Sequence, residues 1–185
     1  MKRLIPFSAA IVMAFSGAAA AASSFTVSSS DVPASGQLSR QQVFQGFGCE
    51  GDNLSPALRW QNPPAGTKSF AVTVYDPDAP TGSGWWHWTV VNLPAATRSL
   101  VTGAGKADKP TLPAGAVQGR NDFGYAGFGG ACPPAGAKPH RYQVTVWALS
   151  ADTLPLDGNA SGALVGYMLN NAVIAKAQMT ATYGR

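Results

Sequence analysis

Alternating apolar and polar positions predict β-strands through the middle of the chain. Residues 68–75, "KSFAVTVY", place Phe70, Val72 and Val74 on one face of a strand and the intervening residues on the other. Two further segments are rich in β-branched and aromatic residues, which also favours strands: 86–93 ("WHWTVVNL") and 140–149 ("HRYQVTVWAL").

A helix is expected only near the C-terminal end. Residues 161–178 carry Leu164, Met168 and Leu169 near helical spacing, and a serine at the start can cap the first turn. The alternation of "AQMTATYGR" over 177–185 then predicts a final strand. The pattern as a whole indicates a mainly antiparallel β protein with a late helix.

A long segment between the predicted strands has no regular period. Residues 95–139 are rich in Gly, Ala and Pro. A connection of this length in a compact domain usually has a function or wraps the core. The chain of 185 residues is long enough to bury one hydrophobic core, and it shows no internal repeat.

The N-terminal segment has the pattern of an export signal. A short basic start, "MKRL", is followed by an apolar run that ends in small residues. We expect residues 1–22 to be a cleaved signal peptide and residues 23–185 to form a single domain. The apolar part is shorter and more diluted by alanine than the ~20 residues of a membrane anchor. The protein is therefore expected in the periplasm or secreted.

The charge of the chain gives little indication of a partner. Thirteen basic and nine acidic residues give a formal net charge of +4, which falls to +2 without Lys2 and Arg3 of the leader. The remaining basic residues are scattered singly, without the stripe that follows a phosphate backbone. Nucleic acid is not expected as a partner.

The chain contains two cysteines, Cys49 and Cys132. In an oxidising compartment such a pair forms a disulfide more often than a metal site or a reactive thiol. A bridge across so long a loop is typically worth ~2–4 kcal/mol. Whether the two Cα atoms approach closely enough to bond is decided by the tertiary structure.

Candidate chemistry is concentrated in residues 75–94, "YDPDAPTGSGWWHWTVVNLP". Asp76 continues the phase of the apolar positions before it, so its side chain should emerge from the core-facing side of its strand. His140 and Tyr142 are in step with the valines that follow them and should face the core as well. Strand ends meet at the rim of a sandwich, so these groups can share one pocket.

The remaining histidine, His87, lies among tryptophans. Strict alternation places His87 on the face opposite to Trp86 and Trp88. Each of these residues taken alone is more often a structural side chain than a functional one. Both histidines of the chain lie in such motifs, which favours a shared functional pocket.

Catalytic and metal-binding alternatives have weaker support. Asp76, Asp78, His87 and His140 could bind a metal, but zinc sites usually show closely spaced histidine pairs. Two aspartates flanking one proline are too close in sequence to straddle a glycosidic bond. Ser83 lies near a histidine, yet "TGSGWW" is not a G-x-S-x-G elbow. We therefore expect neither an enzyme nor a cofactor.

Recognition of an anion explains this set of residue types better. Imidazole N–H groups, a tyrosine hydroxyl and backbone amides of Gly-rich loops can hold a phosphate or a carboxylate. The aspartates would accept hydrogen bonds from the histidines, fix their tautomers and favour the protonated form. Aromatic and proline walls would exclude water and strengthen these hydrogen bonds.

The motifs resemble the phosphatidylethanolamine-binding protein family, also called the Raf kinase inhibitor-like family. The similarity runs from about Phe25 to Arg185, and the ending resembles the bacterial branch. Several motifs occur in the order found in the family: "GCEGDNLSPALRW", "DPDAP", "WWHWTVVN", "GRNDFGYAGFGG", "CPPAGAKPHRY" and "TATYGR".

The resemblance implies a fold, a site and a ligand class. The fold would be a large antiparallel sheet packed on a smaller one, with a C-terminal helix. The pocket would bind phosphate-like anions and phospholipid head groups. Its implied ligand-binding residues are Asp76, Asp78, Pro80, Trp85, His87, Pro133, His140 and Tyr142.

Departures from the family pattern leave the partner open. Cys132 stands where many eukaryotic members have a pocket-lining glycine, and the connection between Pro80 and Trp85 is short. Kinase inhibition is therefore in doubt. Family members also include serine-protease inhibitors, so inhibition of a protease through the loop over residues 95–139 is an alternative. The resemblance also makes a homodimer plausible.

Overall fold

The computed structural model describes residues 24–185. The predicted signal peptide, residues 1–22, lies outside the described residues, as does residue 23. Within the described part, no helix is long and apolar enough to cross a membrane.

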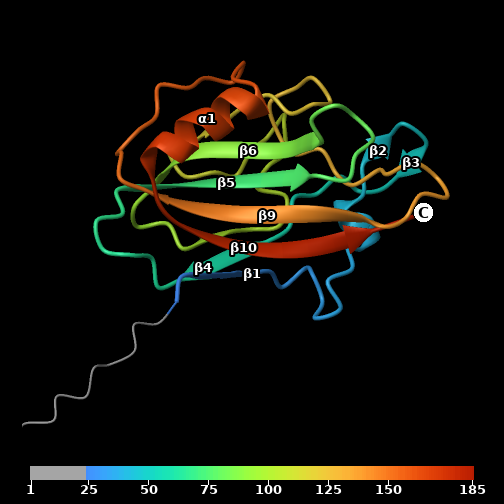
Figure 1. The fold of residues 1–185 in the computed structure, drawn as a ribbon, viewed down its shortest axis with the longest axis horizontal. Helices are drawn as coiled ribbons and strands as arrows, with labels where there is room; N and C mark the ends of the chain where they lie inside the picture. The colour runs from blue at the N-terminus through green and yellow to red at the C-terminus, as the bar shows by residue number, and fades with distance from the viewer. Residues whose placement is uncertain (1–23) are drawn as a thin grey trace, which may run out of the picture.

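A five-stranded sheet forms the centre of the molecule (Figure 1). All neighbouring strands in it are antiparallel, and β5 lies in the middle with β6 and β9 on its two sides. In spatial order the strands are β10 (Val173–Tyr183), β9 (His140–Leu149), β5 (Ser69–Asp76), β6 (Trp85–Pro94) and β8 (Val117–Gln118).

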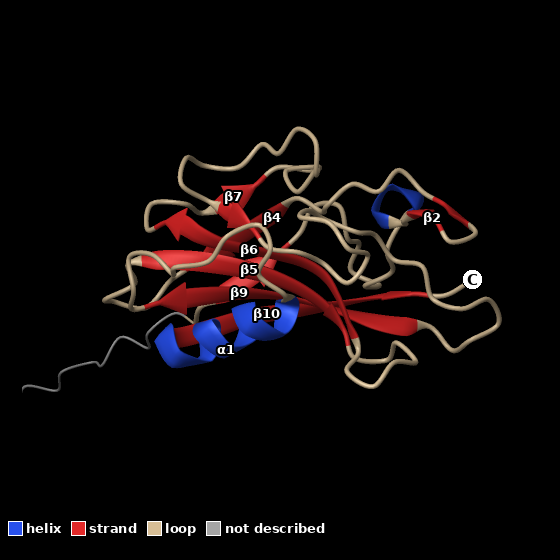
Figure 2. Ribbon diagram, turned by 90° about the horizontal axis from the view of Figure 1, so that it is seen from above, coloured by secondary structure: helices blue, strands red, loops and turns tan. Residues whose placement is uncertain are grey.

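Two further layers cover the large sheet. Figure 2 shows a smaller sheet on one side of it and the helix α1 (Gly162–Ala172) on the other. The smaller sheet consists of β1 (Thr26–Ser28), β4 (Leu58–Gln61) and β7 (Ser99–Leu100). The prediction of an antiparallel sandwich with a large sheet, a small sheet and a C-terminal helix is confirmed. A short 3-10 helix (Arg40–Gln42) and the hairpin of β2 (Gln45–Gly46) and β3 (Cys49–Glu50) complete the fold.

The central strand β5 is buried on both faces, as its alternation predicts. Phe70, Val72 and Val74 pack into the core between the two sheets, where Trp60 of β4 also lies. Ala71 packs on the opposite face, in the cluster beneath α1. Each fully buried large apolar side chain stabilises the fold by about 1.5–3 kcal/mol. These two clusters fix the strand, and with it the position of the aspartate at its end.

The helix is shorter than predicted, and Leu169 is the one buried residue among Leu164, Met168 and Leu169. It begins after Ser161, whose hydroxyl accepts a hydrogen bond from the Leu164 backbone N–H at 3.2 Å, but it ends at Ala172 and not at residue 178. From Val173 to Tyr183 the chain pairs with the whole length of β9. These hydrogen bonds to β9, together with the β-branched residues Val173 and Ile174, outweigh the helix propensity of the segment. Leu164 is exposed, and the residues buried beneath the helix are Gly162, Val165, Leu169 and Ala172.

The segment over residues 95–139 is mostly irregular and wraps the large sheet. It contains only the short strands β7 and β8, and it buries Ala104, Phe128 and Ala131 in the main core. Because its last part returns to the ends of β5, β6 and β9, it can also supply residues to a site there.

Candidate functional site

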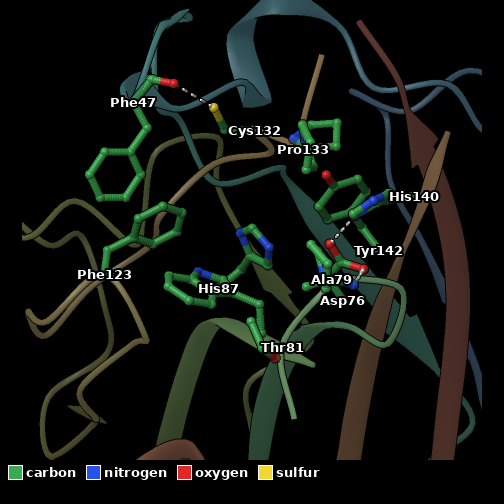
Figure 3. A pocket seen from close by; sticks show the side chains of 13 residues that line it. Phe47, Asp76, Ala79, Thr81, His87, Phe123, Cys132, Pro133, His140 and Tyr142 are labelled. Carbon is green, nitrogen blue, oxygen red and sulfur yellow. Dashed lines mark hydrogen bonds and ion pairs between the residues drawn. The ribbon is translucent and has the colours of Figure 1, made fainter. Parts of the chain in front are cut away.

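A cavity of about 210 Å³ opens where β5 ends and β6 and β9 begin (Figure 3). Aromatic rings and prolines form most of its wall, and a few polar side chains converge inside it. The lining residues are Phe47, Asp76, Ala79, Pro80, Thr81, Trp85, His87, Phe123, Cys132, Pro133, Pro134, His140 and Tyr142.

Asp76 and His140 form a buried pair at the ends of adjacent strands. The His140 Nδ1–H donates to Asp76 Oδ2 at 2.7 Å, because a carboxylate can only accept. The other oxygen of Asp76 accepts the backbone N–H groups of Asp78 and Ala79 at 2.8 and 3.1 Å. The aspartate is therefore fixed by the turn that follows it, and it fixes the ring orientation and tautomer of His140 (Figure 3).

The third polar group, His87, occupies a β-bulge in β6. In the ladder with β5, Trp88 pairs with Val74 and Trp86 pairs with Tyr75, so His87 is an extra residue without a partner. A bulge of this kind interrupts strict alternation along the strand.

The expectation from strict alternation was therefore wrong for Trp88, although Trp86 does lie on the face opposite to His87. Trp88 lies in the core between the sheets, and His87 lies on that side too, with its ring centroid 5.1 Å from that of Tyr142. Trp86 instead lies on the other face of β6, where it packs on Tyr75 and against Gly162 of α1. The bulge thus places an imidazole beside the core without displacing either tryptophan.

The His87 ring is buried and held by one strong hydrogen bond. Its Nδ1–H donates to the carbonyl oxygen of Gly129 at 2.7 Å. Phe123 and Tyr142 contact the ring edge-on from two sides. Burial lowers the pKa of His87 from its usual 6.5, despite the opposing effect of the Gly129 carbonyl.

Three polar atoms of the lining residues are buried without a hydrogen-bond partner. They are Trp85 Nε1, His87 Nε2 and the hydroxyl oxygen of Tyr142. Burial raises the pKa of the Tyr142 hydroxyl, so this group stays protonated and can donate. Unpartnered buried polar atoms are rare and call for an explanation such as a bound ligand or water.

Two aromatic residues that the sequence interpretation did not single out complete the wall. Phe123 comes from the Gly-rich segment "NDFGYAGFGG" and stacks on Phe44 at 4.0 Å between ring centroids. Phe47 stands at the turn between β2 and β3 with a φ of 53°, and it is 71% exposed although it lines the cavity. In the sequence, Phe47 lies between two glycines ("GFG"), a pattern that indicates a tight turn with an aromatic side chain at its tip.

Asp78, a predicted ligand-binding residue, does not line the cavity. Its carboxylate accepts the Arg141 backbone N–H at 2.9 Å and two guanidinium N–H groups at 2.7 and 2.8 Å. The hydrogen bond from the Arg141 side chain lowers the pKa of Asp78 to about 2. Arg141 alternates with His140 and Tyr142 along β9, so Asp78 binds the outer face of that strand.

The other predicted residues lie together around the cavity. Pro80, Trp85 and Pro133 line the cavity together with Asp76, His87, His140 and Tyr142. Ser83 lies outside the lining set, and its carbonyl oxygen accepts the Tyr75 hydroxyl. Among the described residues, no group of three or more His, Cys, Asp or Glu side chains is arranged to hold a metal ion.

The predicted disulfide between Cys49 and Cys132 is present, with 5.9 Å between the Cα atoms. It joins β3 to the segment that carries Pro133 and Pro134, and Cys132 itself lines the cavity. The bridge therefore holds together two segments that supply lining residues, the β2–β3 hairpin with Phe47 and the segment with Pro133.

Comparison with known proteins gives a consistent picture. The family model described as phosphatidylethanolamine-binding protein matches residues 28–184. The protein YbcL of Escherichia coli is 61% identical over 183 residues, which cover 99% of this chain and 98% of YbcL.

Solved structures agree with this match. The crystal structure of E. coli YbcL, described as a new member of the mammalian PEBP family, is similar with a TM-score of 0.85 at 63% identity. That match covers 87% of this chain and 98% of the YbcL chain. A PEBP homolog from Chlamydia trachomatis is similar with a TM-score of 0.72 at 27% identity, over 87% of this chain and 97% of that one.

Proposed function

Because the chain belongs to the phosphatidylethanolamine-binding protein family, we propose that its cavity binds a small anion, a phosphate-like group that is free or part of a phospholipid head group. The single observation that carries this proposal is the set of three unpartnered buried polar atoms on lining residues. An anion would give the Trp85 N–H and the Tyr142 O–H the acceptors that they lack.

The buried pair of Asp76 and His140 supports the same ligand class. Asp76 already accepts three hydrogen bonds, from His140 and from two backbone N–H groups. Its carboxylate therefore orients His140, and the donors around its oxygens partly offset its negative charge. This arrangement explains how an aspartate can line an anion site.

The wall of the cavity adds a requirement on the ligand. Phe47, Phe123, Pro133 and Pro134 surround the polar groups with apolar surface. Such a wall excludes water and strengthens the few hydrogen bonds inside. It also favours a phosphate-like group that carries a short organic substituent over a bare, strongly hydrated ion.

The proposal includes export and a binding role without catalysis. Export is supported by the leader-like pattern at the N-terminus and by the disulfide, since disulfides persist in oxidising compartments. A binding role is supported by the lining groups, which suit holding an anion and include no activated nucleophile.

The proposal is tested by titrating the purified chain with phosphoethanolamine while the imidazole nitrogens are followed by NMR. We expect the resonances of His87 and His140 to shift together and to saturate, because both rings line one cavity. His140→Asn should weaken binding at least about tenfold, because asparagine has no atom at the position of the second ring nitrogen, Nε2. The control Ser83→Ala, outside the cavity, should bind like the wild type.

Two results would contradict the proposal. One is the absence of any shift in a folded protein at millimolar ligand. The other is saturable binding that survives both His87→Asn and His140→Asn unchanged, which would place the anion elsewhere. Inhibition of a serine protease that persists in both variants would favour a protein partner on the loop over residues 95–139.

A further inference from the structure

The buried ring of His87 lines the cavity, and its unpartnered nitrogen is a hydrogen-bond acceptor, whereas an anion site is expected to offer donors. The carbonyl oxygen of Gly129 can only accept, so the hydrogen bond of 2.7 Å fixes a proton on Nδ1. In the neutral ring, Nε2 then carries a lone pair, and this atom is buried and unpartnered.

The groups around His87 do not compensate a positive charge on the ring by direct contact. Asp76 of β5 is bonded to His140 of β9 and to backbone N–H groups. Asp122, in the loop before Phe123, accepts the backbone N–H of Trp86 at 2.7 Å. The remaining titratable neighbour is the hydroxyl of Tyr142, which burial keeps neutral.

An isolated buried imidazolium is costly, so the ring is neutral near pH 7 before an anion binds. Burial lowers the pKa of His87 in accordance with this geometry.

The unpartnered buried polar atoms of the lining residues therefore comprise two donors and one acceptor. The Trp85 indole N–H and the Tyr142 O–H can donate to a ligand, while His87 Nε2 needs a proton from it. A fully ionised anion would bring an oxygen lone pair against the lone pair of Nε2. The mismatch disappears if one proton lies between the ligand oxygen and Nε2.

We propose that the site takes up one proton with its anion, and that it therefore selects phosphate monoesters, which carry an ionisable O–H near neutral pH, over phosphate diesters, which do not. This inference rests on the proposed anion-binding function of the same cavity. In the complex the proton lies either on the phosphate oxygen or on His87 Nε2, and the total count of protons is the same.

The proton balance gives the expected pH dependence. A phosphate monoester loses its second proton with a pKa of about 6, so at pH 7.5 most of the free ligand is the dianion. Binding then draws about one proton per ligand from the buffer, and affinity falls about tenfold per pH unit above pH 7. A diester has no ionisable O–H, so the buried His87 ring itself must be protonated when the diester binds. We therefore expect the diester to bind at least about tenfold more weakly than the monoester.

Calorimetry of the full chain with two matched ligands tests this inference. Phosphoethanolamine is a monoester, and glycerophosphoethanolamine is the diester that occurs in a phospholipid head group. Titrations in two phosphate-free buffers of different ionisation enthalpy give the number of protons taken up. The expected result is about one proton for the monoester and a clear preference for it over the diester.

Two variants show whether the proton taken up on binding depends on His87 or on His140. His87→Asn keeps a donor for the Gly129 carbonyl but has no atom at the position of Nε2. It should bind more weakly and lose most of the proton uptake. His140→Asn keeps a donor for Asp76 and should retain the proton uptake at reduced affinity.

The outcomes separate this inference from the function on which it rests. Equal binding of both ligands without proton uptake would overturn the inference and leave anion binding intact. Proton uptake that is lost in His140→Asn and kept in His87→Asn would overturn it as well. Binding of neither ligand to the folded protein would contradict the proposed function itself.

Discussion

At the scale of single residues, Asp78 has a structural role beside the site. Its carboxylate binds the backbone and the guanidinium of Arg141, and it thereby ties the turn after β5 to the start of β9. That turn also provides the two N–H groups that hold Asp76. Asp78 therefore supports the buried Asp76–His140 pair from outside the cavity.

Asp78→Asn should lower the free energy of unfolding by about 1 kcal/mol at pH 7, a value discounted because Arg141 is half-exposed. The pKa of Asp78 is lowered to about 2, so its contribution is present above its unfolded pKa of about 3.9 and is lost as the pH falls toward 2. The difference between variant and wild type should shrink over this range, as measured by urea unfolding at several pH values.

A matched control is available in another ion pair. Asp152→Asn removes the pair with Lys68, in which both side chains are more than half exposed, and should leave stability unchanged. A constant difference between Asp78→Asn and the wild type from pH 2 to pH 5 would contradict the role given to the carboxylate.

At the scale of elements, the bulge at His87 in β6 determines which side chains of this strand face the cavity and which face the helix. It turns His87 toward the cavity and leaves Trp86 on the helix side, where the indole packs against Gly162 at the start of α1. A Cβ atom at Gly162 would overlap the indole ring of Trp86. The contact between helix and sheet therefore depends on a glycine at this position.

Gly162→Ala should destabilise the protein by about 1–3 kcal/mol, the usual effect of overpacking a buried contact. The control is Gly166→Ala one turn later, where the nearest Trp86 atoms would be 3.7 Å from the new Cβ. That variant should be neutral, or more stable by up to about 1 kcal/mol through higher helix propensity. Thermal unfolding measures both, and equal effects would contradict the proposed contact.

At the scale of the whole molecule, the disulfide ties together segments far apart in the sequence. It joins Cys49 and Cys132, which are separated by 83 residues, and it connects two segments that supply lining residues of the cavity. The double variant Cys49→Ser, Cys132→Ser should lose about 2–4 kcal/mol of unfolding free energy. It should also bind phosphoethanolamine more weakly, because the segments that carry Phe47 and Pro133 are no longer cross-linked.

Urea unfolding and calorimetry measure these two effects. Addition of a reductant should lower the stability of the wild type toward that of the variant and leave the variant unchanged. A variant with the stability and affinity of the oxidised wild type would show that the cross-link does not hold the site together.

The periodic segments of the sequence predicted the strands and much of the site. Strict alternation in β5 and β9 placed Asp76, His140 and Tyr142 on the core side, as the structure confirms. The same rule failed for His87, because a bulge is set by pairing with the neighbouring strand. The helix boundary failed for a similar reason, since pairing of Val173 with β9 overrides local propensity.

The sequence by itself determined the class of the fold, the strands of the large sheet and most of the polar groups of the cavity. These follow from periodicity and residue type, which act locally along the chain. The tertiary structure alone decided that Asp78 faces outward toward Arg141, that Phe47 and Phe123 close the wall, and that the two cysteines meet. Each of these facts depends on contacts between segments far apart in sequence, which no local pattern encodes.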